Sequence, residues 1–481
     1  MPTNRNISWI PAWVDASQLE TFNANIINDQ GGQPWRCTRP LSDRWSVIAD
    51  GLRESTAALR AMPIAHIVET IDKVTAKWCD RNWPVRQAAR AAVVEATGFS
   101  AEAVDRSFDV ELKNYRADSL WRVLYRELGD AAALDGFVAD ARLPGRTYAI
   151  GPELTLAIFT GNVPGLPALS MVRALLAKSA VIAKVASGEP TFAARFAASL
   201  AEEDARIGDA LLVTYWERHE RDLLKTVLSQ AEAVIAYGSI EACRSVRELA
   251  RDNRIYMEHG HKFSAGLVGR DYLARVGAPV IAGRIAEDVG TFNQHACIAP
   301  QVYFVEGDRA AVHKLGDELS RAMQAYAEKY PLGNLRLKDA QTLQLQRAAQ
   351  AWKATVADAD SGLWQDSALN WTIAIEKDLA EHSLSGNRYI GLIPVDSLEQ
   401  ALKALRPYGE FLQNLALGAD EPELSVLARR AALLGASRIC QPGRMAEPSM
   451  MWHHDGQMCV AGLLRWCDIE MHDALHEQEE Q

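Results

Sequence analysis

Apolar residues recur at spacings of three and four along much of the first third of the chain, which is the period of an amphipathic helix. The pattern is clearest in residues 64–74 and 119–124 and extends from about residue 52 to residue 137. It predicts a helical N-terminal layer. The motif Leu143-Pro144-Gly145-Arg146 has the proline and glycine of a turn and closes that layer.

Short β-rich runs alternate with helical segments after that turn. These runs cover residues 154–159, 181–185, 211–215, 233–237 and 265–268. The alternation predicts an α/β fold with a Rossmann-type, doubly wound and largely parallel sheet. Ligands bind such sheets at the carboxyl ends of the strands, so the residues that follow each run are candidate site residues.

Composition narrows the class of protein. With 481 residues and 48% apolar content, the chain can bury the cores of two or three domains. No apolar run approaches the roughly 18 to 20 residues of a membrane span, and residues 1–10 have no signal-peptide pattern. We therefore predict a cytoplasmic protein without a membrane span. The net charge of −11 disfavours nucleic-acid binding, and seven cysteines without a CxxC pair disfavour disulfides or zinc.

Cys297 is the strongest candidate for catalytic chemistry. It lies between a helix-like run, residues 276–292, and an apolar run, residues 302–305, that we expect to be a buried strand. A cysteine attacks a carbonyl as the thiolate, so a loop at a helix end with a lowered thiol pKa would suit it. Locally, a buried structural cysteine is the alternative.

Three strand ends carry further candidates. After the first run, Thr160-Gly161-Asn162 combines an amide that suits an oxyanion with a glycine that lets backbone approach a ligand, although a simple turn has the same composition. Lys184 closes the second run, where the ribose or phosphate of a nucleotide would be a natural partner and a surface lysine is the alternative. Gly238-Ser239 precedes a helix whose free amides suit a pyrophosphate, and Ser239 also suits a helix N-cap.

The segment Glu258-His259-Gly260-His261-Lys262 gathers charged and imidazole groups ahead of the fifth run. We predict Glu258 as a general base or proton relay. His259 and His261 lack a third ligand at a metal-binding spacing, so we predict no metal and read them as polar residues of a solvated loop. No GxGxxG motif follows any strand, so a nucleotide must be held in another way.

Together these motifs resemble the aldehyde dehydrogenase superfamily, and specifically the LuxC-type acyl-CoA reductases of bacterial luminescence, over residues 59–470. Asn162 resembles the oxyanion asparagine and Lys184 the lysine that holds the adenosine ribose. Gly238-Ser239 resembles the phosphate turn, and Cys297 the nucleophile of an Asn-Gln-x-Ala-Cys signature. The ending, residues 438–470, is similar to the terminal block of LuxC-type enzymes. Within it we read His454 and Asp455 as a hydrogen-bonded corner near an oligomer contact.

Three departures from the superfamily pattern bear on which cofactor is bound and on the role of Glu258. Cys243 stands where the phosphate turn usually has a second glycine, and Glu258 begins Glu-His-Gly-His-Lys instead of Glu-Leu-Gly-Gly-Lys. Ser187 stands where many NAD-preferring relatives carry an acidic residue. Because a 2′-phosphate is then not repelled, we expect NADPH, held by Thr160, Gly161, Lys184, Ser187, Gly238 and Ser239, with NAD as the alternative.

The resemblance implies four segments: an N-terminal helical layer (1–145), an NAD(P)-binding domain (146–262), an α/β catalytic domain with the cysteine (263–435) and a C-terminal oligomer contact (436–481). It also implies NADPH-dependent reduction of an acyl-CoA to the aldehyde through an acyl-cysteine, with Asn162 and Glu258 assisting Cys297. A homo-oligomer and an acyl-transfer partner protein are further expectations. The alternatives are an aldehyde dehydrogenase that releases acid and a non-catalytic protein that holds acyl groups.

Overall fold

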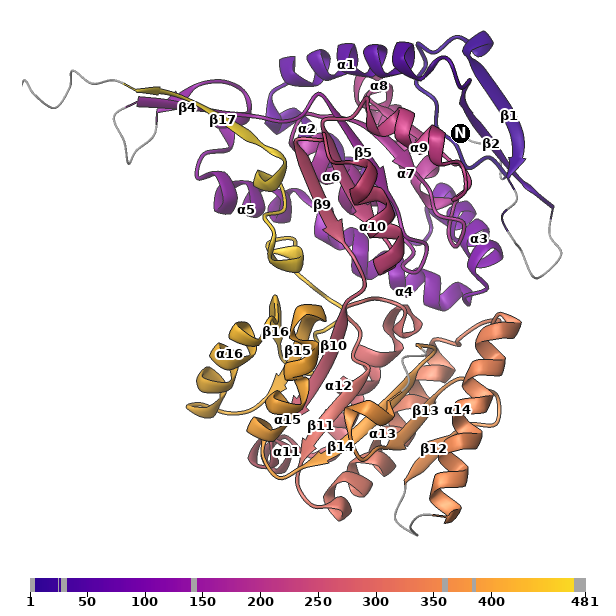
Figure 1. Cartoon of the computed structure of the whole chain (residues 1–481), viewed down its shortest axis with the longest axis vertical. Helices are drawn as coiled ribbons and strands as arrows, with labels where there is room; N and C mark the ends of the chain where they lie inside the picture. The colour runs from indigo at the N-terminus through magenta and orange to yellow at the C-terminus, as the bar shows by residue number, and fades with distance from the viewer. Residues whose placement is uncertain are drawn as a thin grey trace, which may run out of the picture.

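The computed structural model describes residues 5–24, 26, 33–139, 145–356, 362–382 and 386–470. Figure 1 shows two α/β lobes, each built around its own sheet, and an antiparallel arm that extends from the upper lobe. The predicted fold class, with a parallel cofactor-type sheet, a second α/β unit and a helical N-terminal layer, is confirmed.

The upper lobe contains a parallel sheet in the order β7-β6-β5-β8-β9. Its central strands are buried on both faces, and for that reason they appear in the sequence as continuous apolar runs. Four runs were predicted, whereas β9 was not, because its half-polar sequence has no such run. The strands are β5 (Leu154–Ile158), β6 (Ala180–Lys184), β7 (Leu211–Thr214), β8 (Ala233–Tyr237) and β9 (Ile255–His259).

Helices cover this sheet, and the first five form the predicted N-terminal layer (Figure 1). Their apolar stripes are buried against the sheet and its flanking helices in one core. An unpredicted hairpin, β1 (Leu19–Ala24) and β2 (Trp35–Pro40), precedes them. The helices are α1 (Trp45–Ala61), α2 (Ile64–Cys79), α3 (Pro84–Thr97), α4 (Ala101–Leu112), α5 (Ala117–Leu128), α6 (Pro167–Leu176), α7 (Phe192–Glu203), α8 (Ala205–Asp209), α9 (Arg221–Leu228) and α10 (Ile240–Leu249).

The lower lobe has a sheet in the order β12-β13-β14-β11-β10-β15-β16, parallel except at β12. The predicted run at 265–268 belongs to this sheet and not to the cofactor sheet. The predicted strand at 302–305 is confirmed as β11. The strands are β10 (Phe263–Val268), β11 (Val302–Glu306), β12 (Leu363–Gln365), β13 (Thr372–Ile375), β14 (Tyr389–Val395), β15 (Leu412–Gly418) and β16 (Arg438–Cys440).

Helices also flank the lower sheet, and the predicted helix at 276–292 is divided between two of them. Gly277, with φ of 91°, separates α11 from α12, which ends at Gly290. The helices are α11 (Arg270–Val276), α12 (Ala278–Gly290), α13 (Arg309–Lys329), α14 (Leu337–Val356), α15 (Leu398–Leu405) and α16 (Glu423–Leu434). Short 3-10 turns are η1 (Ala16–Gln18), η2 (Lys113–Tyr115), η3 (Ala131–Leu134), η4 (Thr291–Gln294), η5 (Leu379–Glu381), η6 (Arg406–Phe411), η7 (His454–Gly456) and η8 (Ala461–Leu463).

The C-terminal segment leaves β16 in the lower lobe and returns to the upper lobe. Its last strand, β17 (Arg465–Glu470), pairs antiparallel with β4 (Gly145–Ile150), which also pairs with β3 (Val138–Ala139). The segment therefore spans both lobes. The first part of the predicted turn at 143–146 and the charged tail at 476–481 lie outside the described residues. Within the described part of the chain, no helix is long and apolar enough to cross a membrane.

Candidate active site

Two adjoining cavities lie between the lobes at the carboxyl ends of the upper strands. The thiol cavity contains Cys297 and has a volume of about 480 Å³, and the lysine cavity contains Lys184 and has a volume of about 740 Å³. Both volumes are in the range of small-molecule sites. The cavities share a wall made by Thr160, Asn162, Tyr237, Gly238 and His295.

The loop that carries Cys297 has an unusual backbone. Phe292, Asn293 and Gln294 adopt left-handed φ angles of 57°, 52° and 64°. Each such residue costs about 1–2 kcal/mol relative to right-handed helix. Buried amides hold this conformation, because Gln294 Nε2 donates to two carbonyls at 2.7 and 2.8 Å and the Arg388 guanidinium donates to Asn293 Oδ1 at 2.7 and 3.1 Å. The Asn-Gln part of the signature therefore shapes the loop that carries Cys297.

Cys297 is half-buried on this loop, as predicted, but its thiol is not acidic in the free protein. Burial, helped by the nearby Asp455 carboxylate, raises the pKa of Cys297 to about 12. The Gln413 side chain and backbone amides of Cys297 and Ile298 act in the opposite direction. The lowered pKa expected from the sequence is therefore wrong, because the burial of this loop raises the pKa of the thiol.

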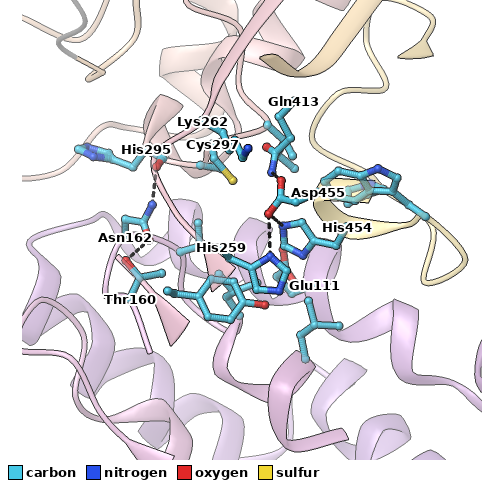
Figure 2. Close-up of a pocket in the computed structure, with 18 of the residues that line it drawn as sticks. Glu111, Thr160, Asn162, His259, Lys262, His295, Cys297, Gln413, His454 and Asp455 are labelled. Carbon is cyan, nitrogen blue, oxygen red and sulfur yellow. Dashed lines mark hydrogen bonds and ion pairs between the residues drawn. The ribbon is translucent and has the colours of Figure 1, made fainter. Parts of the chain in front are cut away.

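Asn162 lies beside the loop that carries Cys297, where its amide can reach an oxyanion. Thr160 Oγ1 donates to Asn162 Oδ1 at 2.8 Å, and Asn162 Nδ2 donates to the His295 carbonyl at 2.6 Å (Figure 2). These contacts fix the amide with its nitrogen toward the loop of Cys297. One N–H of Asn162 is left after this bond, and it suits the oxyanion role predicted from the sequence.

A buried hydrogen-bonded network forms another wall of the thiol cavity, and it includes His454 and Asp455, which we had predicted as a hydrogen-bonded corner near an oligomer contact. Asp455 Oδ2 accepts from His259 Nδ1 at 2.7 Å, and Asp455 Oδ1 accepts from Gln413 Nε2 at 2.5 Å. His454 stacks on His259 with ring centroids 4.1 Å apart. Figure 2 shows the Cys297 sulfur pointing toward the Gln413 and Asp455 side of this group.

Arg173 of α6 determines which ring nitrogens of the two histidines carry hydrogen. Its guanidinium lies 3.3 Å from His259 Nε2 and 3.5 Å from His454 Nδ1, so both atoms act as acceptors. The hydrogens are then on His259 Nδ1 and His454 Nε2, which face Asp455. Burial, joined by neighbouring positive charge, lowers the pKa of both histidines well below the usual value.

The same network bears on metal binding. One potential ligand atom from each of His259, His454 and Asp455 lies within 4.8 Å of the others. However, the two ring nitrogens that face Asp455 carry hydrogens, and a metal bound there would require their lone pairs. Moving the hydrogens to the opposite nitrogens would point them at the Arg173 guanidinium. We therefore describe the group as a hydrogen-bonded network.

Glu258, the predicted general base, is not brought to Cys297. Its carboxylate accepts from Arg247 of α10 at 2.9 and 2.5 Å, and it is absent from the described lining of either cavity. The reason is the alternation of side chains along β9, which turns His259 into the cavity and Glu258 away from it. Of the two histidines that we expected on a solvated loop, His259 is instead buried at the end of β9, whereas His261 is exposed in the loop that follows.

The rest of the thiol cavity is largely apolar. Glu111 is an exception, a buried carboxyl group in this wall. Burial raises its pKa to about 7, although a hydrogen bond donated by Tyr115 acts to lower it. Sequence analysis had no signal for Glu111, Arg173 or Gln413, which lie within helices or strands without a motif. Apolar side chains of this wall are Val163, Leu166, Leu169, Met450 and Trp452.

The lysine cavity gathers the cofactor candidates except Ser239. A methyl group on Gly161 would lie 2.5 Å from the Glu189 nitrogen, so this close approach of two loops requires glycine. Ser239 caps α10, as predicted, with Oγ accepting from the Ala242 nitrogen at 3.3 Å, and lines the thiol cavity instead. The predicted residues of the lysine cavity are Thr160, Gly161, Lys184, Ser187 and Gly238, and sequence analysis missed Glu217, Arg218 and Arg221.

Lys184 gives the lysine cavity a pH-dependent charge. Burial lowers its pKa to about 8, although Glu217 and Glu220 oppose the shift. The positive charge of Lys184 is therefore present below about pH 8 and lost above it.

If Lys184 holds an anionic cofactor, NADPH affinity should fall above pH 8 by at most about tenfold per pH unit. Fluorescence titration from pH 6.5 to 9.5 measures this, and Lys184→Arg should flatten the profile, whereas an unchanged decline would assign it to another group.

Comparison with solved structures defines the class of fold. The chain is similar to aldehyde dehydrogenase 21 from Physcomitrella patens with a TM-score of 0.77 at 12% identity, covering 98% of this chain and 100% of that one. It is also similar to an oxidoreductase from Marinobacter aquaeolei, with a TM-score of 0.73 at 14% identity over 97% and 98% of the two chains. The fold is that of the aldehyde dehydrogenases.

Sequence comparison then gives the family. Residues 59–466 match the acyl-CoA reductase (LuxC) family, so the chain belongs to it. It is 24% identical over 306 residues to a long-chain acyl-protein thioester reductase from Photobacterium phosphoreum, a match that spans 63% of this chain and 61% of the relative. A relative of the same name from Photorhabdus luminescens is 23% identical over 85% of this chain and 82% of its own length.

Proposed function

We propose that the protein reduces a fatty acyl thioester, with acyl-CoA as donor, to the aldehyde through an acyl group on Cys297. One observation carries this proposal: a cysteine and an oriented amide, Asn162, lie in one cavity that shares a wall with a second, basic cavity. Family membership supports the same class of reaction.

The residues of the chain have separate roles in this reaction. Cys297 attacks the thioester carbonyl, and the oxyanion accepts hydrogen bonds from the Asn162 amide and a backbone N–H near Cys297. CoA departs and leaves the acyl group on sulfur. A nicotinamide cofactor, when bound in the lysine cavity, supplies the hydride that reduces this acyl group. The tetrahedral adduct on Cys297 then collapses and releases the aldehyde.

The position of Glu258 favours reduction over acid formation. An aldehyde dehydrogenase that releases acid needs a base to activate water at the acyl-enzyme, whereas a reductase loses substrate if water is activated. Because the Glu258 carboxylate is paired with Arg247 and turned from the thiol cavity, it does not present that base. This observation supports the reductase over the aldehyde dehydrogenase alternative.

The lining of the lysine cavity supports NADPH as the cofactor. Ser187, Arg218 and Arg221 line it together with Lys184, and guanidinium groups are suited to a 2′-phosphate. The amino end of α10 also faces the cavity through Glu241 and Ala242, which suits a pyrophosphate. Glu217 is the acidic member of this lining and could instead accept from ribose hydroxyls, so NAD is the alternative that the experiment below decides.

We also propose a homo-oligomer that uses the arm. All six residues of β17 are exposed, and Trp466 and Ile469 among them remain 41% and 43% exposed. Exposed aromatic and aliphatic side chains on a projecting strand suit contact with another subunit. An acyl-transfer partner protein remains a prediction from the family resemblance.

The test is oxidation of NADPH, and separately of NADH, with a panel of saturated acyl-CoAs while free thiol and aldehyde are recorded in parallel. Equal amounts of oxidised NADPH, thiol and aldehyde are expected. Thiol release without NADPH oxidation would favour the acyl-holding alternative. Acid formed from an aldehyde and NADP without CoA would favour the aldehyde dehydrogenase alternative.

A further inference from the structure

The Cys297 thiol faces a carboxylate that is held in a fixed position. Figure 2 shows the sulfur on the side of the thiol cavity toward the Asp455 carboxylate and the Gln413 amide. Asp455 has a left-handed backbone, with φ of 55°, and its side chain is 3% exposed. A strained, buried aspartate at a cavity wall is a common arrangement at functional sites.

Within the hydrogen-bonded network, Asp455 is the residue whose lone pairs face the thiol cavity. Gln413 Nε2 and His259 Nδ1 both donate to it, one to each oxygen. The lone pairs of His259 and His454 point to Arg173, so neither ring offers a basic atom to the cavity. Glu258 is paired with Arg247 on the far side of β9.

Gln413 connects this carboxylate to the nucleophile. Its amide donates to Asp455 Oδ1 and also lies within hydrogen-bonding reach of Cys297, where it favours the thiolate. The second carboxylate of the described cavity lining, Glu111, is occupied by the hydrogen bond from Tyr115 at 3.4 Å. The negative charge that acts on Cys297 is that of Asp455.

We propose that Asp455 is a catalytic residue that takes the proton from the Cys297 thiol as the sulfur attacks the thioester, and passes it to the departing thiolate. This inference rests on the proposed function. Gln413 and His259 are positioning residues that hold the carboxylate, and Arg173 positions His259.

The step balances in atoms and charge. The bond from Cys297 sulfur to the acyl carbon forms, the bond from that carbon to the CoA sulfur breaks, and one proton moves from the first sulfur to the second through an Asp455 oxygen. Nothing is oxidised or reduced. Because donor and final acceptor are both thiols, the proton that the carboxylate accepts from Cys297 is passed on to the CoA sulfur, and the carboxylate is regenerated at the end of the step.

This role makes two measurements move in opposite directions. Without substrate, the Asp455 charge disfavours the Cys297 thiolate, so Asp455→Asn should speed alkylation of Cys297 by iodoacetamide several-fold at pH 8. During acyl transfer the same variant lacks the proton acceptor, so acylation should slow at least tenfold. A residue that acts only through its charge would speed both.

The experiment uses octanoyl-CoA with full-length protein, and follows acylation of Cys297 by rapid quench and mass spectrometry. Asp455→Glu should recover part of the acylation rate. Asp43→Asn, a substitution at an aspartate whose side chain is 72% exposed, is the matched control and should behave as wild type.

The outcomes separate this inference from the proposed function. If wild type is acylated and Asp455→Asn is acylated as fast or faster, Asp455 is not the proton carrier. If both alkylation and acylation slow in Asp455→Asn, the Asp455→Glu variant decides between the two readings. Recovery of acylation in that variant supports the proposal, and absence of recovery overturns it. Wild-type protein that is never acylated would overturn the proposed function itself.

Discussion

Cys297→Ala is expected to lower acyl-CoA reduction by about 10⁴-fold or more, because removal of a catalytic nucleophile removes the covalent route. The loss should affect thiol release and NADPH oxidation equally, since both follow the acyl group on this sulfur. Cys297 is half-buried at a cavity wall and packs at the edge of a small apolar cluster, so the melting temperature of the variant is measured alongside its activity. Steady-state assays of CoA release and NADPH oxidation measure both effects.

Cys79→Ala is the matched control. Cys79, the last residue of α2, is also half-buried and free, but it does not line either cavity. It should keep the wild-type rate. A Cys297→Ala protein that retained full reductase activity would contradict the covalent mechanism, whatever its melting temperature.

Asn162→Ala is expected to slow acylation of Cys297 by about 10²-fold, the usual cost of one oxyanion donor. The physical reason is the fixed amide orientation, since Thr160 holds Oδ1 and leaves Nδ2 toward the loop that carries Cys297. The effect should appear in the maximal rate of acylation more than in the half-saturating substrate concentration, because the hydrogen bond strengthens as the carbonyl oxygen gains charge.

Alkylation of Cys297 by iodoacetamide distinguishes this role from a change in thiol reactivity, because alkylation forms no oxyanion. It should change less than threefold in Asn162→Ala. If alkylation and acylation slowed by the same factor, Asn162 would act on the loop through its bond to the His295 carbonyl and not on the substrate.

Continuous apolar runs made most of the upper sheet predictable, because strands buried on both faces need such runs. This pattern is absent from β9, because its side chains alternate between the cavity and the surface. The missed strand changed the role expected of Glu258. With residues 258–262 read as a loop, Glu258 could reach Cys297, whereas the geometry of β9 turns its carboxylate toward Arg247. Whether Glu258 faces Cys297 depends on the direction of its side chain from the strand, and the local amino-acid composition does not reveal that direction.

The positions of Cys297, Asn162 and Lys184 at the cavities were predictable because each lies at or after a recognisable strand or helix end. Gln413 and Arg173 were not, since they belong to β15 and α6 and reach the cavity only through tertiary packing. Asp455 was noticed but placed near an oligomer contact, because 158 residues separate it from Cys297 in the sequence and no spacing rule connects them. The raised thiol pKa of Cys297 likewise comes from burial that the sequence does not display.

The crossing of the C-terminal segment between the lobes has a consequence for synthesis of the protein. Asp455 and His454 follow Cys297 by more than 150 positions and return to a cavity wall opposite residues that were made long before. A nascent chain therefore carries Cys297 in a cavity that lacks one wall until residues 454 and 455 have been made. Chains that terminate early would keep the thiol yet lack the residues that surround it, so premature release yields an incomplete enzyme.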